Sequence, residues 1–310
     1  MFNKFLHHAT SFRRCTLVVA MAFTASLAAL SVASPALAAP KGEYAVFADC
    51  PLSNAELSAC IVARTESGEI TIGKQTVPIV NTQTLQGGFT GEETGFEPGA
   101  TKFVGAADGN TLSKTPQPVP GGLLGLVKCK EIKNPVLRKL CEAIEKSKLN
   151  AVNATTELAA PASSIGLIES VFLAELPSPP FPPALSLPVK VKLDNPLLGN
   201  ECYIGSESSP IILNLYTGMV TPPPPNKPIK GSKGTLSSRA EGGILVVSKN
   251  SLVDNAFAAP KASGCGGFFS FLIDPIINAK LGLPSAAGHN TAILNGTLEQ
   301  TGAEVAREHE

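Results

Sequence analysis

The stretch that decides the fold class runs from Cys60 to Ile72 and reads CIVARTESGEITI. Apolar and β-branched residues gather at both of its ends, and the pair Ser67-Gly68 between them is typical of a turn. This pattern predicts a hairpin whose two strands cover 60–64 and 69–72. Short strands joined by turns are therefore the expectation for the sequence around it.

The rest of the chain repeats this pattern of short apolar runs separated by turn residues. Its 310 residues include 28 Gly and 26 Pro, more than an average domain holds, so turns and loops should be abundant. The pair Asn295-Gly296 is a strong signal for another tight hairpin. Further strands are predicted at 44–49, 187–193, 211–216, 243–248 and 293–298.

Two short helices are expected among these strands. A helix over about 135–149 is predicted, because Asn134 can cap it and Pro135 suits its first position. A second helix should open at Asp274-Pro275 and end before Gly282. Strands do not alternate regularly with helices, so a doubly wound sheet is not expected. The expected fold is mainly β, with sandwich-like antiparallel sheets, two short helices and disulfide staples.

Residues 1–38 have the character of a secretory signal peptide. A basic leader precedes an uncharged apolar run over 16–32, and Ala36-Leu37-Ala38 is a small-x-small cleavage signal. Cleavage would leave a chain without a transmembrane anchor, because no later stretch reaches the length of a membrane span. An uncleaved anchor is the alternative, although the apolar run is short for one. The expected localisation is secreted, or extracellular.

Six cysteines follow the leader, which suggests three disulfide bonds in an exported chain. A zinc site would need close pairs such as C-x-x-C, and the sequence has none. Several connectivities are possible, and the sequential one keeps each bond inside one apparent structural unit. It joins Cys50 to Cys60, Cys129 to Cys141 and Cys202 to Cys265.

Prolines suggest a division of the mature chain. The run at 177–188, PSPPFPPALSLP, should be extended and is the expected connection between two β-rich units. The first unit would cover 39–176 with one helix, and the second would cover 189–302. A polar tail would follow at 303–310. The sequence leaves open whether the two units are separate domains.

Charge and composition narrow the classes of partner. The leader carries Lys4, Arg13 and Arg14 and no acid, so the mature chain keeps 22 of 25 basic residues against all 25 acidic ones. This small negative charge argues against nucleic acid as a partner. Clustered metal ligands are missing, so no metal and no cofactor are expected. The expected partner is an unidentified extracellular or cell-envelope component.

One pattern could support an enzyme. Residues 162–166, ASSIG, resemble the nucleophile elbow of α/β hydrolases, with Ser164 at its centre. His289 would be the base, and Asp254 or Asp274 would supply the acid between them in the chain order of that class. An elbow needs a strand before it and a helix after it, which the surrounding sequence does not predict. An extracellular serine hydrolase built on Ser164, Asp274 and His289 is therefore the alternative function.

Four segments carry a family resemblance: 43–52 reads EYAVFADCPL, 195–199 reads NPLLG, 202–206 reads CYIGS and 283–290 reads LPSAAGHN. Together they resemble a family of exported bacterial proteins of unknown function. The resemblance implies export and a shared disulfide-bearing fold, and it brings no activity or ligand. The leading expectation is a secreted, non-enzymatic extracellular or envelope-associated protein that binds or packs through loops on a β scaffold.

Overall fold

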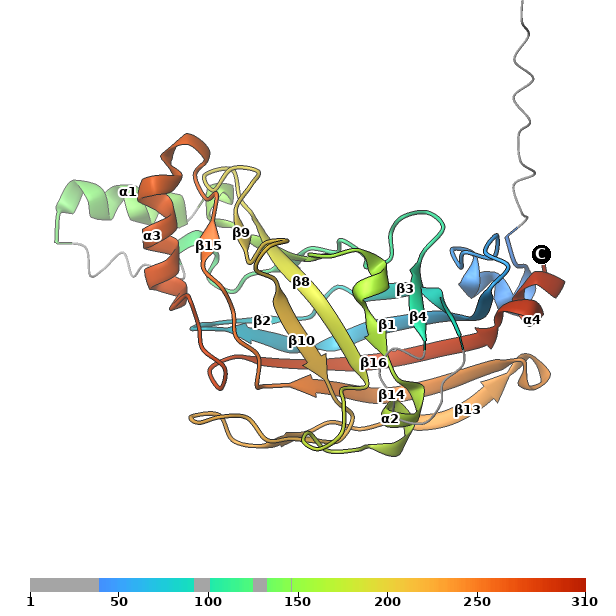
Figure 1. Ribbon diagram of the computed structural model, residues 1–310. Helices are drawn as coiled ribbons and strands as arrows, with labels where there is room; N and C mark the ends of the chain where they lie inside the picture. Colours follow the sequence, from blue (N-terminus) through green and yellow to red (C-terminus); the bar gives the residue numbers. More distant parts are fainter. Residues whose placement is uncertain (1–38, 92–100, 125–132, 146) are drawn as a thin grey trace, which may run out of the picture. The chain divides into compact units, whose positions relative to one another are not determined.

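The computed structural model describes residues 39–91, 101–124, 133–145 and 147–310. Most strands in these ranges belong to two seven-stranded antiparallel sheets (Figure 1). The first sheet has the order β13-β14-β16-β1-β3-β4, and β2 pairs with β1 outside this path. Its strands are β1 (Leu57–Ile72), β2 (Gln75–Pro78), β3 (Gln83–Thr90), β4 (Lys102–Gly105), β13 (Thr235–Arg239), β14 (Ile244–Asp254) and β16 (Thr291–Gly302).

The second sheet has the order β15-β9-β8-β6-β5, and both β7 and β10 pair with β8 outside this path. Its strands are β5 (Gln117–Pro118), β6 (Asn153–Leu158), β7 (Gly166–Leu167), β8 (Leu185–Asp194), β9 (Tyr203–Ile204), β10 (Ile211–Leu215) and β15 (Ala262–Ser263). A separate two-stranded sheet pairs β11 (Met219–Val220) with β12 (Ile229–Lys230).

One apolar core combines residues of both sheets. Every second residue of β8 from Leu185 to Leu193 is buried, as expected for a strand with one face on a core. Ile61, Leu85 and Leu294 of the first sheet belong to the same buried cluster as these β8 residues. The prediction of a mainly β, sandwich-like fold is therefore confirmed.

Short helices complete the fold. Both predicted helices are present with shifted ends, and two very short ones, α2 and α4, were missed. The α-helices are α1 (Pro135–Glu145), α2 (Glu169–Ala174), α3 (Ser270–Leu281) and α4 (Ala303–Glu308). The 3-10 helices are η1 (Gly42–Phe47), η2 (Gly122–Leu124), η4 (Lys148–Asn150), η5 (Ala162–Ser164), η6 (Ala240–Gly242) and η7 (Gly267–Phe269).

Helix α3 begins at Ser270 and not at Asp274 as predicted. The preceding η7 leads directly into it, so Pro275 lies inside the helix instead of in its first turn. Asp274 was expected to cap the helix, but its carboxylate accepts hydrogen bonds from the preceding loop. In α1 the predicted cap is confirmed, because the Asn134 side chain accepts a hydrogen bond from the Val136 amide.

The predicted strand at 44–49 is wrong, because these residues belong largely to the 3-10 helix η1. A 3-10 helix has three residues per turn, so Tyr44 and Phe47 lie on one side of it. Both side chains are buried in a cluster with Ala303 and Ala306 of α4. Packing against α4, which lies at the far end of the sequence, thus overrides the local strand pattern.

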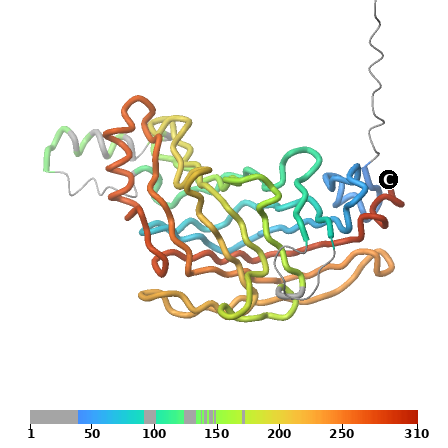
Figure 2. The backbone as a smooth tube through the Cα atoms, in the orientation of Figure 1, coloured from blue at the N-terminus to red at the C-terminus, as the bar shows by residue number. Residues whose placement is uncertain are grey.

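Both predicted hairpins are also wrong, because each pair of turn residues lies inside a long strand. Ser67-Gly68 lies within β1, and Asn295-Gly296 lies within β16. These two strands pair antiparallel, and Ser67 is opposite Asn295 across a bulge in β1. Figure 2 shows the two strands, near opposite ends of the described chain, running side by side.

Close approach of the two strands explains why these glycines are needed. A Cβ atom on Gly68 would overlap the carbonyl oxygen of Ile293, and one on Gly296 would overlap the carbonyl oxygen of Arg64. Glycine in a strand can mark such an approach as well as a turn. The local sequence does not distinguish the two situations, because the neighbouring strand comes from far away in the chain.

Strand pairing answers the question of domain organisation that the sequence left open. β1 pairs with β16, and β6 pairs with β8, so both sheets combine strands from either side of the proline-rich segment. The described residues from Ala39 to Glu310 all belong to one compact unit. The proline-rich segment itself packs on β11, because the Ser178 amide donates a hydrogen bond to the Met219 carbonyl oxygen.

The C-terminal residues 303–310, which the sequence predicts to be a polar tail, are packed against the rest of the protein. Residues 303–308 form α4, whose Ala303 and Ala306 are fully buried. Arg307 fixes the helix further, because its guanidinium donates hydrogen bonds to the carbonyl oxygens of Leu52 and Asn54. In the described part of the chain no helix is both long and apolar enough to cross a membrane.

Two of the three predicted disulfide bonds are present, Cys50 to Cys60 and Cys202 to Cys265. The first joins the segment after η1 to β1, and the second joins the segment before β9 to the loop after β15. The third predicted bond cannot be followed, because Cys129 lies outside the described residues. Both bonds that are present have the sequential pairing.

We expect Gly296→Ala to destabilise the protein by about 1–3 kcal/mol, because the added methyl group forces β16 away from β1. Urea unfolding measures this change. Gly166→Ala in β7 is the matched control: its Cβ would meet only the Ser186 side chain at an ordinary 3.5 Å. Equal stability of the two variants would contradict the close approach.

Candidate functional site

An apolar cavity of about 70 Å³ lies between the two sheets. Its walls are inward-facing residues of both sheets, spaced two apart along each strand as the pleat requires. Helices η2 and α3 complete the wall with Leu123, Ile277 and Leu281. The principal strand residues are Ile70, Ile72, Val77, Ala154, Val191 and Leu193.

A second cavity of about 60 Å³ adjoins the first. Ile70, Gln83 and Thr156 line both, so these three residues form a waist between the two spaces. The second cavity continues along the core between β1 and β8, past Leu85 and Leu187. Space lined mainly by apolar side chains accepts apolar molecules, because water gains too few hydrogen bonds against such a lining.

Two glutamines on the cavity wall differ sharply in their hydrogen bonding. Gln117 makes three hydrogen bonds: its Oε1 accepts from the amides of Val80 and Asn81 at 2.9 and 3.0 Å, and its Nε2 donates to the Asn81 carbonyl oxygen at 2.6 Å. Gln83 is only 8% exposed, and its side-chain amide, whose polar atoms are not fully enclosed, makes no hydrogen bond to the other described residues. An unpartnered amide in an apolar cavity is costly unless a ligand or water engages it.

The position of Gln83 follows from the strand pattern. β3 buries Gln83 and Leu85 on its inner face, and Thr84 between them points to the other face. Gln83 pairs through its backbone with Thr65 beside the β1 bulge. The side chain therefore reaches the waist between the cavities, where Thr156 of β6 provides the only other shared polar side chain.

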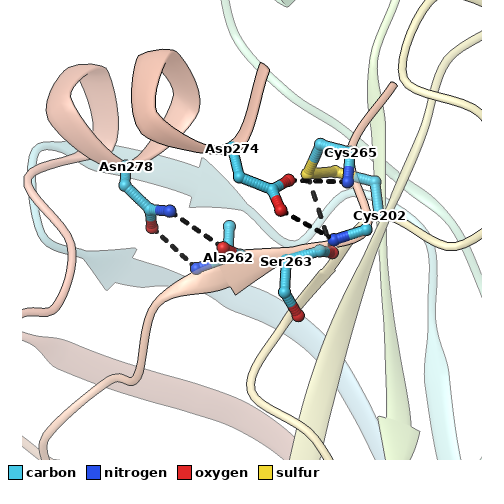
Figure 3. Close-up of a disulfide and its surroundings, with 7 residues drawn as sticks. Cys202, Ala262, Ser263, Cys265, Asp274 and Asn278 are labelled. Carbon is cyan, nitrogen blue, oxygen red and sulfur yellow. Dashed lines mark hydrogen bonds between the residues drawn. A yellow bond between two sulfur atoms is a disulfide. The ribbon is translucent and has the colours of Figure 1, made fainter. Parts of the chain in front are cut away.

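Helix α3 closes the first cavity and is fastened to the second sheet. Ile277 and Leu281 are buried on its cavity side. One turn apart on an adjacent face, Asp274 accepts hydrogen bonds from the Cys265 and Gly264 amides at 2.7 and 3.1 Å, and Asn278 exchanges two with the Ala262 backbone (Figure 3). The Cys202–Cys265 bond reinforces this attachment.

The two ends of α3 are held as well. The Gly266 amide before it donates to the Leu198 carbonyl oxygen. At its C-terminus, the Leu281 carbonyl oxygen accepts from the Lys74 amide, in the turn between β1 and β2. Helix α3 thus bridges both sheets at one end of the apolar core.

The residues of the alternative hydrolase site make separate contacts and none of these contacts joins one of them to another. Ser164 is exposed in η5, and its hydroxyl donates to the Pro161 carbonyl oxygen. Asp274 binds the loop amides described above. His289 is exposed in the loop before β16, where its backbone amide donates to the Ala286 carbonyl oxygen. Asp254 is buried, and its carboxylate accepts from the amides of Asn214 and Ala256.

The local structure at Ser164 also differs from a nucleophile elbow. Ser164 ends a three-residue 3-10 helix, and the two-residue strand β7 follows it, where an elbow requires a longer helix. Burial raises the pKa of Asp254 to about 6, which outweighs the two amide hydrogen bonds that favour its charged form. The bond from the Asn214 amide joins β14 of the first sheet to β10 of the second, and the bond from the Ala256 amide closes a local turn, so both hydrogen bonds of Asp254 are structural.

Metal ligands are not brought together in the described ranges. No group of three or more His, Cys, Asp or Glu side chains there could hold an ion. Nothing in the sequence alone marks Gln83, Thr156 or the cavity. The alternation of apolar residues in β6 and β8 could identify which residues face inward. A cavity between two sheets, however, depends on how the side chains of both sheets pack together, and the sequence of one strand does not contain that information.

Related proteins give no guide to the cavity. Comparisons of the chain with protein-family models, with curated proteins and with solved structures find no match. The chemistry of the site must therefore be inferred from its lining, which is apolar with one unpartnered amide at its waist.

We expect replacement of the two cavity glutamines by the near-isosteric methionine to have opposite effects. Gln83→Met should raise the free energy of unfolding by up to about 1 kcal/mol, because it removes a largely buried amide that has no partner among the described side chains and backbone groups. Gln117→Met should lower it by more than about 2 kcal/mol, because it leaves three backbone groups unpaired. Denaturant unfolding of both variants measures this, and comparable losses in both would contradict the assignment of Gln83 as unpartnered.

Proposed function

We propose that this is an exported, non-enzymatic binding protein whose ligand is an apolar chain held between the two sheets. The observation that carries this proposal is the pair of adjoining apolar cavities with the Gln83 amide at their waist. A structural β-sandwich gains stability by filling such space, because each empty volume of this size forfeits packing contacts. An apolar lining with a few polar side chains, which in the first cavity are Gln75, Gln83, Gln117 and Thr156, has the composition of small-molecule sites.

The lining determines the class of ligand. An acyl chain would gain free energy by moving its methylene groups from water onto side chains such as Val77, Val191 and Ile277. The Gln83 amide can donate through Nε2 and accept through Oε1, so it suits a carbonyl or hydroxyl group on the ligand. A charged head group would remain outside the first cavity, because no charged residue lines it, and Arg64 on the wall of the second cavity is already paired with Glu299.

Several features support export. Disulfide bonds form and persist in oxidising compartments, and the described residues contain two of them. Residues 1–38 also have the sequence pattern of a cleavable signal peptide. The resemblance to a family of exported bacterial proteins of unknown function agrees with this inference. An envelope-associated or extracellular carrier would need no catalytic group.

We expect secreted protein to begin at Ala39. N-terminal sequencing of protein recovered outside the expressing cells tests this. Recovery of a chain that begins at Met1, or retention of all the protein inside the cells, would contradict export.

Ligand binding can be tested directly with dansyl-labelled undecanoic acid, whose fluorescence rises in an apolar site. We expect saturable binding at one site per chain. Ala154→Leu places a larger side chain in the first cavity and should weaken binding at least about tenfold. A tenfold rise in Kd corresponds to a loss of about 1.4 kcal/mol of binding free energy. Circular dichroism confirms that the variant folds.

Glu157→Leu is the matched control, because it adds the same side chain to β6 on the opposite face of the strand. We expect its affinity to equal that of the wild type. Absence of saturable binding by the wild type, or equal affinity of all three proteins, would contradict the proposal. Labelling of Ser164 by a fluorophosphonate probe, abolished by His289→Gln, would favour the serine hydrolase instead.

A further inference from the structure

Five large apolar side chains lie exposed together on η7 and the first turns of α3. Phe268 is 88% exposed and Phe271 is 67% exposed. The rings of Phe268 and Phe269 meet edge to face at 5.5 Å. We call these five residues the apolar cap: Phe268, Phe269, Phe271, Leu272 and Ile276.

Two lysines lie near the C-terminal end of α3, and the single carboxylate between Gly266 and Gly282 is bound to backbone amides. Lys280 is exposed in the last turn of α3. The Lys74 side chain lies against Gly282 just beyond the helix. Asp274 is the one acidic residue between Gly266 and Gly282, and its two oxygens are bound to backbone amides of the preceding loop. The segment from Gly266 to Gly282 is therefore apolar at one end and positive at the other, and its one carboxylate is already bound to backbone amides.

We propose that the apolar cap docks on an anionic lipid bilayer, from which the cavity takes up its acyl chain; this last step rests on the proposed function. Phenylalanine and leucine side chains enter the boundary between head groups and acyl chains, while lysines attract anionic head groups. A protein partner is favoured less, because its binding usually depends on Trp, Tyr and Arg, and the apolar cap contains none of these.

The arrangement of α3 links the apolar cap to the cavity. Ile277 and Leu281 line the first cavity from one side of the helix, and Phe271, Leu272 and Ile276 are exposed on another. Apolar side chains thus occur on both sides of a helix only about 10 Å wide. Most soluble surface helices have one polar side, so an apolar outer side is unexpected unless it meets an apolar environment.

Co-sedimentation with vesicles tests the docking. The full mature chain is mixed with vesicles of phosphatidylcholine alone or with phosphatidylglycerol added. We expect binding to the anionic vesicles, and a loss of about tenfold or more in the double variant Phe268→Ser, Phe271→Ser. The double variant Lys74→Gln, Lys280→Gln should lose the preference for phosphatidylglycerol, by about fivefold for each lysine.

Leu236→Ser is the matched control, because Leu236 is similarly exposed, at 54%, but lies on β13. It should bind vesicles as the wild type does. Binding that is unchanged in the phenylalanine variant, or absent in the wild type, would overturn the proposal. The proposal would also be overturned if the wild type does not bind vesicles and is a dimer in light scattering, while the phenylalanine variant is a monomer.

The phenylalanines do not line the cavity, so the two proposals can fail separately. We expect the Phe268→Ser, Phe271→Ser protein to bind dansyl-labelled undecanoic acid in solution as the wild type does. Vesicle binding without fatty-acid binding would retain the docking surface and reject uptake of the chain. Fatty-acid binding without vesicle binding would reject the docking surface alone.

Discussion

The structure depends on the pairing of β1 with β16, which joins segments separated by most of the described chain. This pair forms the centre of the first sheet, between β3 on one side and β14 on the other. Gly68 and Gly296 permit the close approach at the β1 bulge. Beside it, Glu299 of β16 binds Arg64 of β1 and Arg239 of β13 and ties three strands together. Such a non-local pair fixes the width of the space that the second sheet must cover.

The position of the cavity, and of the helix α3 that closes it, follows from that geometry. The second sheet supplies β6 and β8 across the core, and the space that remains is apolar except for Gln83 and a few other side chains with partners or partial exposure. Helix α3 then closes one end through hydrogen bonds to both sheets and the Cys202–Cys265 bond. A helix held this firmly can carry exposed phenylalanines without unfolding, because its stability comes from its attachments.

The sequence predicts the elements whose signals are local. Local pattern identifies β8, β10 and the first part of β14, the cap at Asn134 identifies α1, and cysteine spacing identifies two disulfide bonds. The errors occur where distant segments decide the outcome. Glycines that allow two strands to approach were interpreted as turns, and η1 was interpreted as a strand although α4 covers it. The cavity escapes prediction for the same reason, because empty space depends on both sheets at once. No single residue marks it, and an unpartnered Gln83 is recognised only when its neighbours are known.

The central claim is that an apolar chain binds between the sheets, and methyl NMR tests it most directly. Titration of methyl-labelled protein with undecanoic acid should shift the methyl signals of the cavity residues Ile70, Val77 and Ile277 together, at one saturable site. The exposed methyl groups of Leu236 should not move. Shifts confined to exposed methyl groups, or no saturable shifts, would contradict the account and leave the cavity as unfilled core.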